Sequence, residues 1–142
     1  MPEIDYRISK QPEVIMAVAG LEHVNVTVSD PERTAKQLCE LFGWHIRWQG
    51  ESLMGGHTVH VGIDDAYLAL YAPPETAAGN GKSYDIRGGL NHIGVVVDDL
   101  DAAERRVQGA GFEPHSHDDY DPGRRFYFND HDDIEFEVVS YR

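Results

Sequence analysis

Apolar and polar residues alternate along two segments that lie almost half the chain length apart. In "HVNVTV", which begins at His23, a valine at every second position alternates with His, Asn and Thr. The segment "HIGVVV", which begins at His92, places apolar residues at the same alternate positions. This period of two is typical of a strand with one buried face. The chain therefore carries an internal repeat, and each copy begins with a histidine-bearing strand.

A helix and three further strands are predicted after each of these strands. Between Pro31 and Gly43, apolar residues recur at helical spacing, and the glycine ends the helix. Ser29 and Glu32 fit a capping box at the start of this helix. In the second copy the corresponding helix ends at Gly111. The strands are predicted at about 44–49, 57–63 and 66–72 in the first copy, and at about 112–117, 124–129 and 134–141 in the second.

The order βαβββ in both copies predicts an α+β fold. Module 20–73 and module 90–142 form a single domain, 20–142, with a linker at 74–89 that is rich in Gly, Pro and small polar residues. An N-terminal extension, 1–19, contains "EVIMAVAG", which can add an edge strand. A four-stranded sheet with one helix leaves one face bare, so the two modules are expected to pair into a larger curved mixed sheet.

Composition narrows the classes of partner. The net charge of −13 repels phosphate backbones and anionic membranes, so we expect neither nucleic acid nor a membrane as partner. No apolar run approaches the length that spans a bilayer, and the N-terminus lacks the pattern of a signal peptide. The single cysteine, Cys39, lies on the apolar face of the first predicted helix. It is expected to be a core residue of a cytoplasmic protein.

Polar side chains of several predicted strands fall on one face of the sheet. Because the apolar residues face the helices, the opposite face carries His23, His60, His92, Tyr127 and Glu137. Two histidines and a carboxylate from different strands bind one side of a divalent ion such as Fe, Mn, Ni or Zn. Either histidine alone is more simply explained as an ordinary strand residue. Their equivalent positions in the repeat favour a metal site instead.

These segments resemble the vicinal oxygen chelate superfamily, which includes glyoxalase I, extradiol dioxygenases and the fosfomycin and bleomycin resistance proteins. The resemblance covers about residues 20–142 and rests on "LEHVNVTVSDPE", "LNHIGVVVDDLDAA" and "FYFNDHDDIEFEVV". It implies paired modules that form a metal-binding cup, often in a homodimer. Carried onto this sequence, the resemblance implies His23 and His92 as ligands of one divalent ion. The ligand in the last strand falls on Glu137, with Glu135 as the alternative.

At some positions the sequence differs from particular members of the superfamily. The fourth ligand of glyoxalase I falls on Ala69, which cannot ligate, so the three-ligand pattern of dioxygenases and fosfomycin resistance proteins is favoured. Asn25 stands where the fosfomycin enzymes are expected to carry threonine. No histidine occurs in the segment before His92, where dioxygenases carry a further catalytic histidine. Tyr127 lies in the strand before Glu137, where the resemblance implies the active-site tyrosine of the dioxygenases, and His60 is the other candidate for acid–base chemistry.

Three functions remain open from the sequence. The favoured one is a metal-dependent enzyme, dioxygenase-like or lyase- or isomerase-like, acting on a small oxygen-rich organic substrate. The second is a metal-independent protein that binds or sequesters a small molecule, as bleomycin resistance proteins do. The third is a structural or regulatory module with a vestigial site. For the enzyme and the binding protein alike, the cleft is expected to be lined by Asn25, Trp44, Trp48, Tyr67 and Tyr71.

Overall fold

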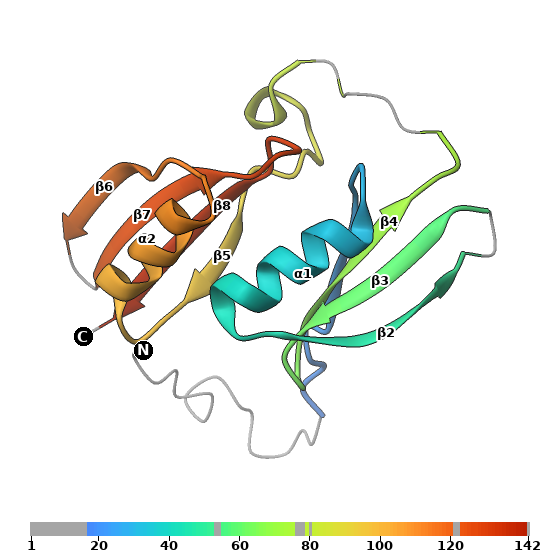
Figure 1. Cartoon of the computed structure of the whole chain (residues 1–142), viewed down its shortest axis with the longest axis horizontal. Coiled ribbons are helices and arrows are strands. Elements are labelled where there is room, and N and C mark those ends of the chain that lie inside the picture. Colours follow the sequence, from blue (N-terminus) through green and yellow to red (C-terminus); the bar gives the residue numbers. More distant parts are fainter. Residues whose placement is uncertain (1–16, 53–54, 76–78, 80, 121–122, 142) are drawn as a thin grey trace.

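The computed structural model describes residues 17–52, 55–75, 79, 81–120 and 123–141. Within these ranges the chain forms two modules, each with one α-helix and one four-stranded mixed sheet (Figure 1). This arrangement confirms the predicted α+β fold with two βαβββ modules. Neither α-helix in the described part of the chain is long and apolar enough to cross a bilayer.

The first module contains sheet A, with the strand order β1-β4-β3-β2. β1 pairs with β4 in parallel, whereas β3 pairs in antiparallel with both β4 and β2. One face of β3 and β4 is buried under α1, through Val59, Val61, Leu68 and Leu70. The elements are β1 (His23–Thr27), α1 (Pro31–Phe42), β2 (His45–Glu51), β3 (His57–Gly62) and β4 (Tyr67–Ala72).

The second module repeats this arrangement in sheet B, with the strand order β5-β8-β7-β6. β5 pairs with β8 in parallel, and the other pairs are antiparallel. A short 3₁₀ helix, η1 (Ser83–Asp85), lies in the linker between the modules. The elements of the second module are β5 (Ile93–Val96), α2 (Leu100–Gly109), β6 (His115–Tyr120), β7 (Gly123–Asn129) and β8 (Glu135–Tyr141).

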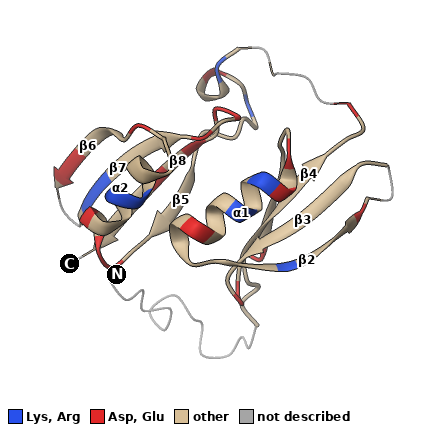
Figure 2. Ribbon diagram, viewed as in Figure 1, with Lys and Arg blue, Asp and Glu red and all other residues tan. Residues whose placement is uncertain are grey.

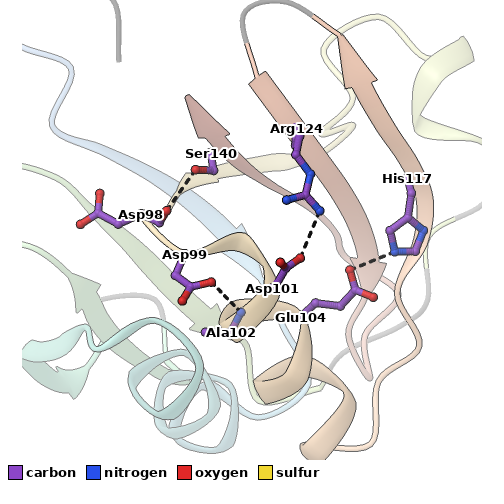
Figure 3. Close-up of polar contacts among 8 residues, drawn as sticks. All are labelled: Asp98, Asp99, Asp101, Ala102, Glu104, His117, Arg124 and Ser140. Atoms are coloured by element: carbon purple, nitrogen blue, oxygen red, sulfur yellow. Dashed lines mark hydrogen bonds and ion pairs between the residues drawn. The ribbon is translucent and has the colours of Figure 1, made fainter. Parts of the chain in front are cut away.

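Polar contacts hold α2 against sheet B (Figure 3). The side chain of Asp99 caps the helix by accepting a hydrogen bond from the backbone N–H of Ala102 at 3.0 Å. Further contacts join the start of α2 and the residue before its cap to β6, β7 and β8. They are Arg124 to Asp101 at 3.1 Å, His117 to Glu104 at 3.0 Å and the Ser140 hydroxyl to the backbone carbonyl of Asp98 at 3.2 Å.

The N-cap of α1 is Asp30, so the predicted capping box on Ser29 is wrong. The Asp30 carboxylate accepts a hydrogen bond from the backbone N–H of Arg33 at 3.2 Å. Pro31 is the first helical residue, because its fixed φ suits a helix and its missing N–H has no helical partner there. The backbone N–H of Ser29 donates instead to Asp132 of the second module, at 3.1 Å. Ser and Asp are similarly good caps, so the local sequence did not separate them.

One hydrophobic core joins the two modules. The ring of Phe42, at the end of α1, lies 6.3 Å from the rings of Phe128 and of Phe136 in sheet B. α1 and α2 contact each other and lie in front of the sheets in Figure 1. The side chain of Arg106 on α2 donates to the backbone carbonyl of Leu41 on α1 at 2.8 Å. Buried residues of both modules therefore form a single cluster.

The strands β1 and β5 are the edges at which the two sheets face each other (Figure 1). No Cα atom of β1 lies within 8 Å of one in β5, whereas Cα atoms of directly paired strands are about 4.5–5.5 Å apart. A cavity of about 310 Å³ lies between the two edges. Neither β1 nor β5 contains a Lys, Arg, Asp or Glu, and Figure 2 shows the β5 ribbon free of charged residues.

The edge strand expected from "EVIMAVAG" is described only in part. Residues 17–20 belong to no strand, and the remainder of that segment lies outside the described residues. Cys39 is half-buried and packs against the core, as the sequence predicts. Burial raises the pKa of its thiol above the ordinary value, which disfavours the reactive thiolate.

Candidate functional site

The face of sheet A opposite α1 carries a row of rings. We call it open face A and define it by His23, Trp48, His60 and Tyr67. The Tyr67 ring stacks between those of His23, at 4.9 Å, and His60, at 4.6 Å. Trp48, which is half exposed, continues the row at 5.1 Å from His60. The strand register explains this gathering, because His23 pairs with Tyr67 and Trp48 pairs with His60.

Charged side chains flank the rings of open face A. Glu22 Oε1 lies 2.9 Å from His23 Nδ1, and the Tyr67 hydroxyl donates to the same oxygen at 3.4 Å. The hydrogen bond with His23 lowers the pKa of the Glu22 carboxyl. The Arg47 guanidinium lies 4.3 Å from the centre of the Tyr67 ring. Burial lowers the pKa of His60, which favours a neutral imidazole at physiological pH.

The face of sheet B opposite α2 carries the second histidine and both candidate carboxylates. We call it open face B and define it by His92, Tyr127, Glu135 and Glu137. The Tyr127 hydroxyl donates to Glu137 Oε1 at 2.6 Å, and this bond raises the pKa of the phenol. Arg125 Nη1 lies 3.6 Å from the same carboxylate oxygen. The His92 ring meets the Tyr127 ring edge-on at 5.8 Å.

Tyr84 is a member of this site that the sequence analysis missed. It lies on η1 in the linker, and its hydroxyl donates to Glu135 Oε2 at 2.8 Å. The same hydroxyl is 3.2 Å from Nδ1 of His92. The bond to Glu135 raises the pKa of the Tyr84 phenol. The available signal was a lone aromatic residue in a linker of Gly and small polar residues, which is weak without a fold.

The strand register shows which residues of the two modules occupy equivalent positions. Asn25 of β1 pairs with Ala69, whereas Gly94 of β5 pairs with Glu137. Ala69 therefore occupies the place in sheet A that Glu137 occupies in sheet B. On the next strand, His60 pairs with Ala69 and Tyr127 pairs with Glu137. The two acid–base candidates thus stand at equivalent positions of the two modules.

The three predicted metal ligands lie on two different sheets. His23 belongs to open face A, and His92 and Glu137 belong to open face B. Among the described residues, no three or more His, Cys, Asp or Glu side chains are grouped so as to hold one ion. The donor types suit a divalent cation, but the described part of one chain does not bring a full set together.

The residues predicted to line one cleft lie in different parts of the structure. Asn25 is exposed on β1, and the Tyr71 hydroxyl donates to the backbone carbonyl of Gly55 at 3.4 Å. Trp44 packs against Phe42, at 5.4 Å between rings, and lines the cavity between β1 and β5. Tyr67 and His23 line the same cavity, whose remaining walls are mostly apolar: Leu21, Val24, Ile63, Ala66, Leu68, Ile93, Val95 and Val96.

Solved structures with the same fold include proteins of several kinds. A glyoxylase/bleomycin resistance protein/dioxygenase domain from Frankia sp. EAN1pec is 22% identical, with a TM-score of 0.74, covering 89% of this chain and 100% of that one. An antibiotic binding protein from Streptomyces sp. CB03234 is 22% identical, with a TM-score of 0.69, covering 90% and 100%. The fosfomycin resistance protein FosX from Listeria monocytogenes, complexed with Mn(II) and sulfate, is 19% identical, with a TM-score of 0.68, covering 89% and 95%. At these identities the likeness establishes the fold alone.

The sequence itself matches one family model. Among proteins with curated descriptions, none matches this chain significantly. The model of the Glyoxalase/Bleomycin resistance protein/Dioxygenase superfamily matches residues 20–138, which include the first module and the second as far as the middle of β8. Because this match covers most of the sequence, the chain belongs to the Glyoxalase/Bleomycin resistance protein/Dioxygenase superfamily.

Proposed function

We propose that the chain is a metal-dependent enzyme acting on a small oxygen-rich organic substrate, with His23, His92 and Glu137 as ligands of one divalent ion. The main support is the equivalence of the two histidines, each at the first strand of its module, with Glu137 on the strand beside β5. Two imidazoles and a carboxylate leave open positions on the ion for substrate or oxygen. Ala69, at the position equivalent to Glu137, supplies no fourth ligand.

The residues around the ligands have distinct roles in this proposal. A divalent ion held there would act as a Lewis acid towards neighbouring oxygens of the substrate. Tyr127 orients the Glu137 carboxylate through their 2.6 Å hydrogen bond. Burial lowers the pKa of His60, which favours the neutral imidazole that can accept a proton from a bound substrate. The donor types suit Fe, Mn, Ni or Zn, and the Mn(II) in FosX makes a divalent ion a reasonable inference by fold.

The site is completed, in this proposal, by a second copy of the chain. Within one copy, His23 lies on sheet A whereas His92 and Glu137 lie on sheet B, and the facing edges β1 and β5 do not pair with each other. An unpaired strand edge is open to pairing with another chain. Both edges lack charged residues, so the net charge of −13 does not have to be buried in such an interface. A homodimer would bring open face A of one copy towards open face B of the other.

We expect the protein to sediment as a dimer at micromolar concentration. Val96→Lys places a charge on the β5 edge, where the valine is 55% exposed, and should shift the population towards monomer. Ile46→Lys is the matched control, because Ile46 is 42% exposed on β2, at the other end of sheet A. Sedimentation velocity of the three proteins makes the comparison. A wild-type protein that sediments only as monomer contradicts the homodimer.

A metal-independent binding protein is the second candidate. The supporting observation is the cavity of about 310 Å³ between β1 and β5, with its mostly apolar walls and the ring of Trp44. A cavity of this size is within the range of small-molecule pockets, which are predominantly apolar with few polar groups. The similar fold of an antibiotic binding protein is consistent with such a role.

Metal analysis separates these two candidates. We expect protein purified without chelator to contain about one equivalent of a divalent metal per chain, because one facial set of ligands binds one ion. Elemental analysis should cover Fe, Mn, Ni and Zn, before and after dialysis against EDTA and readdition of each metal. Protein that neither retains nor rebinds any of the four metals contradicts the enzyme proposal. Binding of the apolar dye ANS to such metal-free protein would favour the binding protein.

A further inference from the structure

The linker residue Tyr84 has a hydroxyl that faces two partners at once. It donates its single proton to the Glu135 carboxylate at 2.8 Å. A hydroxyl has only one proton to donate, so towards His92 Nδ1, at 3.2 Å, it presents a lone pair. The imidazole must then be the donor, through an Nδ1–H group. The hydrogen bond at one ring nitrogen decides which tautomer a neutral histidine adopts.

The other histidine has a comparable arrangement at the same nitrogen. His23 Nδ1 lies 2.9 Å from Glu22 Oε1, and an ionised carboxylate can only accept hydrogen bonds. The Tyr67 hydroxyl also donates to this carboxylate oxygen, at 3.4 Å. Each histidine is thus accompanied by one glutamate and one tyrosine. The order differs, because the carboxylate contacts His23 directly, whereas a tyrosine stands between the carboxylate and His92.

We propose that Glu22 and the Tyr84–Glu135 pair are positioning residues, which hold His23 and His92 as Nδ1–H tautomers with the Nε2 lone pairs available to a cation. This inference rests on the proposed function for the identity of that cation. It also assigns Glu135 a role that differs from the role of Glu137, although the two carboxylates share a face of β8. Glu135 polarises Tyr84, whereas Glu137 remains the ligand.

Two separate segments converge on this arrangement. Tyr84 comes from η1, before β5, and Glu135 from the start of β8, so their bond also connects η1 to open face B. Tyr84 is 61% exposed, and its conformation therefore depends on these polar contacts more than on burial. Partners of this kind on the second nitrogen of a ligand histidine fix the ring and its tautomer, and their loss costs about 10–100-fold in metal affinity.

Tautomers can be measured in metal-free protein. At alkaline pH, where imidazoles are neutral, long-range ¹⁵N–¹H correlation spectra distinguish Nδ1–H from Nε2–H rings. We expect both histidines to be Nδ1–H in the wild type, against the preference of free imidazole for the Nε2–H form. Tyr84→Phe should release His92 to a mixture and leave His23 unchanged, and Glu22→Ala should do the reverse. Tyr120→Phe, which removes an exposed hydroxyl on β6, is the matched control and should change neither ring.

Zinc affinity, measured by chelator competition on the same proteins, provides the second readout. Tyr84→Phe and Glu22→Ala should each weaken Zn²⁺ binding by about 10–100-fold, and Tyr120→Phe should leave it unchanged. Nε2–H rings in the wild type, or variants that keep both tautomers and zinc affinity, would overturn the inference. If the tautomers behave as expected but the wild type binds no zinc, manganese, iron or nickel, the proposed function fails while the positioning of the rings stands.

Discussion

Replacement of His23, His92 or Glu137 by alanine is expected to remove most of the bound metal while the protein stays folded. Loss of an outer partner already costs about 10–100-fold in affinity, so loss of a direct ligand should exceed about 100-fold. The two histidine variants should lose little stability, because the same strands are held from the opposite face by Val95, Phe136 and other core residues. Glu137→Ala should cost more, because it also removes the partner of the Tyr127 hydroxyl and of Arg125. Metal content and melting temperature should be measured together on each variant.

Two carboxylate variants make this experiment specific. Glu135→Ala should give an intermediate loss, because Glu135 contacts His92 only through Tyr84. Glu113→Ala removes an exposed carboxylate before β6 and should leave metal content unchanged. If all three ligand variants keep the wild-type content, the metal proposal is wrong. If Glu135→Ala loses the metal and Glu137→Ala does not, the two carboxylates have exchanged roles.

Mixing the variants tests whether one chain or two supply the ligands. In a mixed dimer of His23→Ala and Glu137→Ala, one site loses both residues and the other keeps the full set. Random pairing after joint refolding makes half of the dimers mixed, so about a quarter of the wild-type metal content should return. A site formed within a single chain gives no recovery, because each chain then carries one defective site. That result would refute the shared site without affecting the choice of ligands.

Strand positions and the faces they bury were largely predictable from the sequence. Alternating valines, as at Val59 and Val61, fix which face of a strand is buried, because the side-chain period is two. The same parity placed His60 and Tyr127 on the open faces, which the register confirms. Local alternation carries this information, so no knowledge of the tertiary arrangement was needed.

The arrangement of the two modules was not predictable in this way. The distance between His23 and His92 depends on how α1 packs against sheet B through Phe42, which is a non-local contact. The role of Tyr84 depends on where η1 lies relative to His92 and Glu135, which is also a non-local contact. Trp44, expected in the cleft, packs against Phe42 and borders the cavity, because it directly follows the helix end at Gly43. Periodicity describes each element and leaves such packing undetermined.

Phe136→Ala is expected to lower the free energy of unfolding by about 3–5 kcal/mol, the usual cost of truncating a buried phenylalanine. Phe136 is only 1% exposed, and it stacks on Phe128 with ring centres 5.1 Å apart. Its ring also lies 6.3 Å from Phe42 of the first module. A cavity at this position should therefore weaken both modules, even though the substitution is in β8 of the second.

The two tryptophans make this coupling measurable, because Trp44 and Trp48 both belong to the first module. In urea unfolding of Phe136→Ala, tryptophan fluorescence and far-ultraviolet circular dichroism should shift to the same lower midpoint, as in a two-state transition. Tyr120→Ala is the control, because this exposed aromatic residue of the second module contacts Arg125 at 4.6 Å and should cost no more than about 1 kcal/mol. A fluorescence midpoint that stays at the wild-type value while the dichroism signal splits into two steps would mean that the modules have independent cores. The contacts of Phe42 with sheet B would then contribute little to stability.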